Sequence, residues 1–188
     1  MRKKHLVLNA IVILGLGALA IPATADAKGG GGHVRNLRLQ DRCDPASFNA
    51  AIPSAPGAPP TCSEHSGQLI TFADFLAKLN PVDFGHPKWN NHPDELDLKK
   101  GDSISATVRG GEFHTFTEVD AYGPGCVPFI NEALGLAGPP ASDCAAILVS
   151  GTAPGAPPVV VSGLAPGTHL FMCLIHPWMR TEVDVEDD

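Results

Sequence analysis

The segment Cys173-Leu-Ile-His176-Pro-Trp-Met179 places a thiol, an imidazole and a thioether within a short stretch at the end of an apolar run. A Cys sulfur and two imidazoles in a trigonal plane, with a weak axial thioether, form a copper site suited to electron transfer. The segment contributes only one of the two imidazoles. The motif therefore predicts a copper site and requires a second His from elsewhere in the chain.

The second imidazole is expected from His114, in Gly110-Gly-Glu-Phe-His114-Thr-Phe-Thr117. The C-x2-H-x2-M spacing, preceded by Ala165-Pro-Gly-Thr-His-Leu-Phe-Met172, closely resembles the copper-binding loop of cupredoxins. The two-residue gap before Met is most similar to amicyanin. The resemblance implies a type 1 (blue) copper protein with one copper ion per chain. Its ligands would be His114, Cys173, His176 and Met179.

The hydrophobic pattern independently predicts an all-β fold. From Glu95, apolar residues alternate with polar ones on both sides of Lys99-Lys-Gly-Asp102, which indicates a strand, a turn and a strand. Further strands are expected within 113–119, 159–161, 169–173 and 181–185. Short strands separated by Gly/Pro turns favour an antiparallel β-sandwich, and the resemblance implies the Greek-key cupredoxin form.

The chain is expected to divide into a cupredoxin domain at 91–188 and an N-terminal extension at 28–90. The extension should contain one helix over 71–79, packed against the sandwich, and a disulfide loop. Residues 120–158 are expected to be an insertion in the domain. One or two helical turns over 127–134 and a second disulfide would hold this insertion together.

Residues 1–27 have the features of a secretory signal peptide. A basic head is followed by an apolar run and by small residues in A-x-A spacing. We expect an exported, periplasmic or extracellular protein with no stable membrane insertion after cleavage. Retention of the segment as an anchor is the alternative, although its 16-residue apolar run, interrupted by Asn9, is marginal for a span.

An exported protein can form disulfides, and the chain has five cysteines. Four can pair, which leaves one as the proposed copper ligand, Cys173. Sequential pairing, Cys43–Cys62 and Cys126–Cys144, is preferred because it closes two loops of similar size. Each loop would stabilise the fold by about 3 kcal/mol. The other two connectivities remain open from sequence.

The chain is acidic, with a formal net charge of −7. Cleavage after residue 27 removes three of the 13 basic residues and one of the 20 acidic residues, so the charge becomes about −9. That sign argues against nucleic acid or an anionic membrane as partner. It favours redox proteins with a basic docking patch. General solubility explains the charge equally well.

Strand alternation predicts that residues 169, 171 and 173 point the same way, which would place Phe171 and His169 in the core beneath copper. His169 is interpreted as a hydrogen-bonded core or edge histidine rather than a ligand. In cupredoxins the loop His is the solvent-facing edge of copper, and the resemblance gives that role to His176. Trp178 beside it either joins this patch or packs in the core.

One residue departs from the family pattern. Thr115 stands where cupredoxins commonly carry an Asn whose side chain ties the two ligand loops together. A Thr hydroxyl reaches less far.

The hexapeptide Ala-Pro-Gly-Ala-Pro-Pro occurs at 55–60 and again at 153–158. We interpret both copies as rigid loops of similar composition with no shared fold, and partner docking as a polyproline II segment is the alternative.

The expected function is one-electron transfer between redox partners, without enzymatic activity. Copper oxidases and nitrite reductases carry extra His ligands, often directly beside the Cys, and here the neighbours are Met172 and Leu174. A binuclear copper centre would need two Cys in the loop. Delivery of copper to another protein is the main alternative, although the Met- and His-rich sites that such proteins favour are missing. A weaker alternative is an interaction module whose copper site is degenerate.

Overall fold

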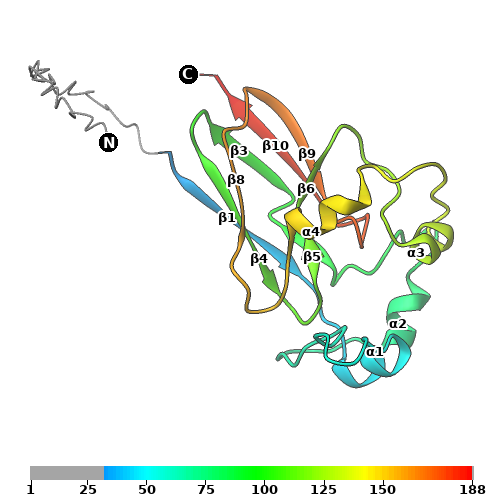
Figure 1. Cartoon of the computed structure of the whole chain (residues 1–188). Helices are drawn as coiled ribbons and strands as arrows, with labels where there is room; N and C mark the ends of the chain where they lie inside the picture. The colour runs from blue at the N-terminus through cyan, green and yellow to red at the C-terminus, as the bar shows by residue number, and fades with distance from the viewer. Residues whose placement is uncertain (1–31, 188) are drawn as a thin grey trace, which may run out of the picture.

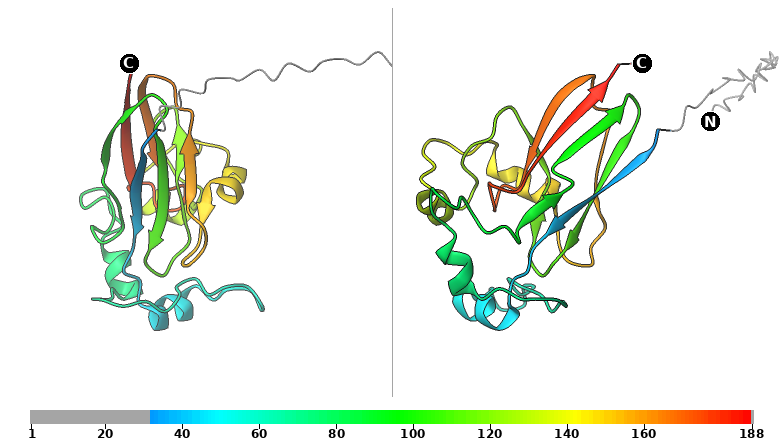
Figure 2. Two further views of the ribbon diagram at one scale, coloured as in Figure 1. Left: turned by 90° about the vertical axis from the view of Figure 1, so that its left-hand side faces the viewer. Right: turned by 180° about the vertical axis from the view of Figure 1, so that it is seen from behind.

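Two four-stranded sheets face each other and enclose the core (Figure 1), and the left-hand view of Figure 2 shows the two layers edge-on. The computed structural model describes residues 32–187. One sheet has the strand order β2-β1-β4-β8 and the other β3-β10-β9-β6. Their strands are β1 (Val34–Gln40), β2 (Asn90–His92), β3 (Glu95–Lys99), β4 (Ser103–Arg109), β6 (Thr117–Val119), β8 (Val159–Ser162), β9 (Gly167–Met172) and β10 (Arg180–Glu186).

The β-sandwich expected from the sequence is confirmed, but its sheets are mixed rather than antiparallel. Strand β1 runs parallel to β4, and β3 runs parallel to β10. The strands on either side of the turn at 99–102 lie in opposite sheets, so they do not form a hairpin. Parallel neighbours need a long connection, and the segment between β1 and β4, which contains two helices, provides it.

The core lies between the sheets, where alternate residues of each strand point inward. In β4 the inward residues include Ile104 and Ala106, and in β10 they include Val183 and Val185. The rings of Phe116 and Phe171 stack with centroids 4.4 Å apart. Each buried side chain of this size stabilises the fold by about 1.5–3 kcal/mol relative to its exposed state. The period-two pattern in the sequence thus reflects these inward faces.

The segment expected to be an N-terminal extension contributes to the sandwich itself, because β1 lies between β2 and β4. The rest of it forms two helices instead of the one expected, α1 (Pro45–Ala51) and α2 (Phe72–Ala77). Thr71 caps α2 by accepting the backbone N–H of Asp74, as the sequence pattern predicts. Both helices lie at one end of the sandwich (Figures 1 and 2).

Aromatic side chains hold these helices against the sandwich. Phe48 from α1 stacks on Trp89 with ring centroids 5.8 Å apart, and Phe75 from α2 lies 4.8 Å from the same indole. All three side chains are almost completely buried. The predicted packing of the helix at 71–79 against the sandwich is therefore confirmed.

The range 120–158 contains short helices, joined by a disulfide. They are α3 (Pro128–Ala133), the 3₁₀ helix η1 (Cys144–Ala146) and α4 (Ile147–Ser150). They lead into β7 (Gly151–Thr152), which pairs with β5 (His114–Thr115). Both preferred disulfides, Cys43–Cys62 and Cys126–Cys144, are confirmed.

The expected signal peptide at 1–27 lies outside the described residues. Within residues 32–187, no helix combines the length and the apolar character needed to cross a membrane.

Candidate metal centre

The structure brings three of the sequence-predicted donors, Cys173, His114 and His176, together at one end of β9 and β5. His114 belongs to β5, and Cys173 follows β9 directly. His176 and Met179 lie in the turn that leads to β10. The backbone of this turn closes on itself: Met179 N–H donates to the His176 carbonyl at 2.9 Å, and Cys173 N–H donates to the Met179 carbonyl at 2.9 Å. The loop that carries three of the four expected ligands is thus fixed by its own hydrogen bonds.

Three of the donors form a buried triangle. Cys173 Sγ lies 3.8 Å from His114 Nδ1 and 3.8 Å from His176 Nδ1. Bonds of about 2.3 Å to sulfur and about 2.0–2.1 Å to nitrogen, as at zinc sites, separate such donors by roughly 3.8 Å at a trigonal angle of about 120°. The donor set and its spacing therefore fit a copper ion held by one thiolate and two imidazoles.

Met179 is completely buried and belongs to the main hydrophobic core. Its backbone is tied to both Cys173 and His176, which keeps the residue beside the triangle. Its role as the weak axial ligand stays a prediction.

The thiol of Cys173 is the only free one among the described cysteines, as expected from the odd cysteine count. Burial alone would raise its pKa, but contacts with His114 and His176 outweigh that effect and hold the pKa well below its usual value. The backbone N–H of Thr115 also approaches Sγ at 3.4 Å. The site thus favours a thiolate, which is the form that binds metal.

Thr115 ties the two ligand segments together despite its short side chain. Its hydroxyl accepts the backbone N–H of Leu174 at 2.8 Å, and Leu174 is the residue after the ligand Cys. Thr115 is completely buried, and Thr117 donates to it at 3.0 Å. Thr115 therefore keeps a connection between the His114 strand and the Cys173 loop.

A buried carboxylate fixes the orientation of the first imidazole. His114 Nε2–H donates to Asp41 Oδ2 at 2.9 Å, and both side chains are fully buried. This bond leaves Nδ1, the atom that faces Cys173, free to bind a metal. A carboxylate on the outer nitrogen of a ligating His orients the ring and increases its basicity.

The charged forms of His114 and Asp41 stabilise each other. Burial would lower the pKa of His114, but its hydrogen bonds with Asp41 and Cys173 raise it to about 10. Burial would likewise raise the pKa of Asp41, but the bond from His114 and the backbone N–H groups of Gly111 and Glu112 lower it to about 2. In the metal-free protein the two residues therefore form a buried ion pair.

Gly110 and Gly111 allow Asp41, which follows β1, to approach the segment that leads to His114. A Cβ at residue 110 would overlap the Asp41 carboxylate. A Cβ at residue 111 would lie 2.7 Å from the sulfur of Cys43 and 2.8 Å from that of Cys62. Real Cβ atoms do not come so close to other atoms. The Gly-Gly pair is thus needed for the close contact of Asp41 and the first disulfide with this segment.

A second buried carboxylate lies near the other imidazole. Glu112 Oε2 is 3.8 Å from His176 Nε2, and Trp89 Nε1–H donates to the same oxygen. Burial raises the pKa of Glu112, although the charges on His176 and His114 oppose that effect. Each imidazole of the triangle therefore has a carboxylate on its outer side.

The expectation that His176 faces solvent is wrong, because its exposed fraction is only 2%. Helix α2 and the aromatic residues around it cover the ring. Phe75 lies edge-on to His176 with centroids 6.1 Å apart, and Trp178 lies 5.4 Å away. Trp178 is partly buried, and its Nε1–H donates to the Trp89 carbonyl at 3.0 Å, so it belongs to this cover.

The expected core position of His169 is also corrected. Phe171 is buried as predicted, but His169, near the beginning of β9, is only partly buried. Its ring bonds to the Glu118 side chain at 2.6 Å and to the Ala165 carbonyl at 2.8 Å. Its interpretation as a hydrogen-bonded edge histidine is confirmed.

Sequence reasoning missed both carboxylates. Glu112 lies two residues before His114, and this proximity was the available signal. Asp41 lies 73 residues from His114 in the chain, and no local pattern connects the two.

Comparisons with known proteins give remote similarities. No protein-family profile and no curated protein matches the chain. Among solved structures, oxidised plastocyanin from Dryopteris crassirhizoma is 14% identical over 81% of this chain and 100% of its own, with a TM-score of 0.39. A purple cupredoxin from Nitrosopumilus maritimus is 14% identical over 57% and 95%, with a TM-score of 0.37. A reduced amicyanin mutant is 22% identical over 50% and 70%, with a TM-score of 0.31.

These three neighbours are all cupredoxins. At such identities and TM-scores, the function rests on this chain's own residues.

Proposed function

We propose that the protein is an exported type 1 copper protein that carries single electrons between redox partners. The observation that carries the proposal is the buried triangle of Cys173, His114 and His176, with each imidazole nitrogen 3.8 Å from the sulfur. When bound, copper would supply the Cu(II)/Cu(I) couple. His114, Cys173 and His176 would hold it, with Met179 as the weak axial donor.

The surroundings of the triangle suit rapid electron transfer. Strands β5 and β9 fix two of the donors, and the hydrogen-bonded turn fixes the third. Thr115 connects the two segments, and Asp41 locks the His114 ring. Donors held in this way cannot relax far when the charge on the metal changes. The reorganisation that accompanies each transfer is therefore small.

Burial of the donors favours a carrier over a copper-delivery protein. A delivery protein must expose its ligands so that an acceptor can replace them one by one. Here Cys173 and His114 have no exposed surface, and His176 is 2% exposed. The residues beside Cys173 are Met172 and Leu174, so the chain lacks the flanking His that would connect a second copper centre.

Export and partner type belong to the same proposal. Two disulfides are typical of an oxidising compartment such as the periplasm or the cell exterior. The acidic chain, with a formal net charge of −7, favours partners that present a basic patch.

A competition between electron and copper transfer tests the proposal. Copper-loaded reduced protein is mixed separately with an oxidised small redox protein and with a copper-free acceptor protein. We expect fast electron transfer in the first mixture and no net copper movement in the second. Copper transfer that is faster than electron transfer would favour the delivery alternative instead.

A further inference from the structure

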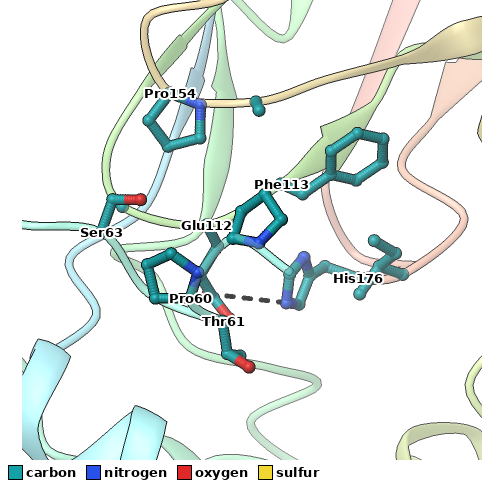
Figure 3. A pocket seen from close by; sticks show the side chains of 11 residues that line it. Pro60, Thr61, Ser63, Glu112, Phe113, Pro154 and His176 are labelled. Atoms are coloured by element: carbon teal, nitrogen blue, oxygen red, sulfur yellow. Dashed lines mark ion pairs between the residues drawn. The ribbon is translucent and has the colours of Figure 1, made fainter. Parts of the chain in front are cut away.

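A cavity of about 500 Å³ lies beside His176 (Figure 3). Its walls are mainly apolar and include Pro59, Pro60, Phe113, Ala153, Pro154 and Ile175. His176 and Glu112 also line it. A dashed line in Figure 3 marks the ion pair between their side chains. The cavity is thus lined in part by an imidazole of the candidate metal centre, although only 2% of that residue is exposed.

Both copies of the repeated hexapeptide contribute to this cavity. The first copy, 55–60, supplies Pro59 and Pro60, and the second, 153–158, supplies Ala153 and Pro154. Two loops with the same sequence, far apart in the chain, thus meet at one opening.

The two copies also share a local conformation, contrary to the expectation from sequence. In each, the N–H of the fourth residue donates to the carbonyl of the first, at 2.9 Å in one copy and 3.1 Å in the other. Gly57 and Gly155 have φ values of +83° and +74°. A Pro followed by a Gly with positive φ and closed by this bond is a type II turn. The turns make both loops rigid walls.

The chemistry of the lining restricts the ligand. Proline rings and Phe113 offer flat apolar surfaces suited to an aromatic ring. No Lys or Arg occurs among the described residues that line the cavity, and the Glu112 carboxylate there disfavours an anion. The Glu112 carboxylate can accept further hydrogen bonds beside the one from Trp89. A cavity of this size suits a molecule of one or two rings.

We propose that this cavity is a binding site for a small uncharged aromatic alcohol of the phenol or hydroquinone class. The ring lies between the two proline loops and against Phe113, and its hydroxyl donates to Glu112. Binding needs only these residues.

The test uses hydroquinone under argon as the probe, titrated into the full-length protein in copper-free and Cu(I)-loaded forms. Binding is followed by NMR shifts of His176 and Phe113. Ala153→Phe fills the cavity from the second loop, and Pro60→Phe fills it from the first. Ala58→Phe is the matched control, because it adds the same ring to a loop residue outside the lining.

We expect saturable binding to the wild type and to Ala58→Phe, and at least tenfold weaker binding to either filling variant that retains wild-type far-UV circular dichroism. Benzoate, which is anionic, should bind more weakly than hydroquinone. The absence of saturable binding to the wild-type protein overturns the proposal, as does unchanged binding to both filling variants or tighter binding of benzoate. Because the copper-free protein is measured as well, a failure of the copper assignment is separate from a failure of this site.

Discussion

Replacing Asp41 by Asn should remove the buried ion pair with His114 and place an amide NH₂ group opposite other N–H donors. The carboxylate accepts four N–H groups: those of Cys43 and Gly111 on Oδ1, and those of Glu112 and His114 on Oδ2. An Asn that keeps its oxygen toward the first two directs its NH₂ group at the other two. Buried donors without acceptors are costly, so the variant loses more than a single bond.

The size of the effect follows from the burial of the pair. Removing one partner of a buried ion pair costs about 3–5 kcal/mol. We therefore expect copper-free Asp41→Asn to unfold about 3 kcal/mol more easily near neutral pH. Loss of the carboxylate behind a metal-ligating His typically lowers metal affinity about 10–100-fold. If Cu(II) loses tenfold more affinity than Cu(I), the reduction potential rises by about 60 mV.

The stability difference should also depend on pH. Because the pKa of His114 is raised from 6.5 to about 10, its contribution is complete below about pH 6.5 and disappears as pH rises through about 10. Because the pKa of Asp41 is lowered from 3.8 to about 2, its contribution is complete above about pH 4 and disappears as pH falls through about 2. The wild type should thus exceed the variant most between about pH 4 and 6.5.

Urea unfolding of the copper-free proteins from pH 4 to 10, together with copper competition titrations, measures both effects. Asp102→Asn is the control, since Asp102 is a buried carboxylate that accepts the backbone N–H groups of His33 and Lys99, in the turn before β4. The control should lose stability but keep copper affinity. Equal copper affinity in Asp41→Asn and the wild type would refute the reasoning about His114.

Three further predictions follow from the site. Thiol titration of the denatured, unreduced, copper-free protein should count one thiol, Cys173, because the other cysteines are paired. Met179→Leu should keep copper and colour but raise the reduction potential in voltammetry, because loss of an axial donor disfavours Cu(II). Thr115→Val should lower the free energy of unfolding by about 1–3 kcal/mol in urea titrations, because it leaves the Leu174 N–H unpaired.

For each of these three predictions, one outcome would contradict it. A count of three or five thiols would remove the argument from the unpaired cysteine. Loss of copper from Met179→Leu would mean that the thioether carries much of the binding. A Thr115→Val variant as stable as the wild type would show that the hydroxyl does not tie the two loops.

The grouping of Cys173, His176 and His114 was the part most readily predicted, because the first two lie within one short loop and His114 in a recognisable strand. Ligation of copper by these residues and by Met179 stays a prediction. The odd cysteine count indicated one free thiol, and the pairing preferred on loop size was confirmed. The alternation around β4 and β10 indicated the sandwich, because side chains in a strand alternate between its two faces.

The surroundings of the site were not predictable in the same way. Asp41 meets His114 only because β1 pairs in parallel with β4, and a register between distant strands leaves no local pattern. The sequence predicted a helix over 71–79 packed against the sandwich but not which surface it would cover. His176 was expected at the surface because of the resemblance to cupredoxins, whereas Phe75 packs against it.

The central claim is that Cys173 and the two imidazoles hold a single type 1 copper. A visible absorption spectrum of the Cu(II)-loaded protein, recorded beside Cys173→Ser, tests it most directly. We expect intense colour from sulfur-to-copper charge transfer in the wild type and none in the variant. Wild-type protein that binds Cu(II) but shows only weak d–d absorption would contradict the claim.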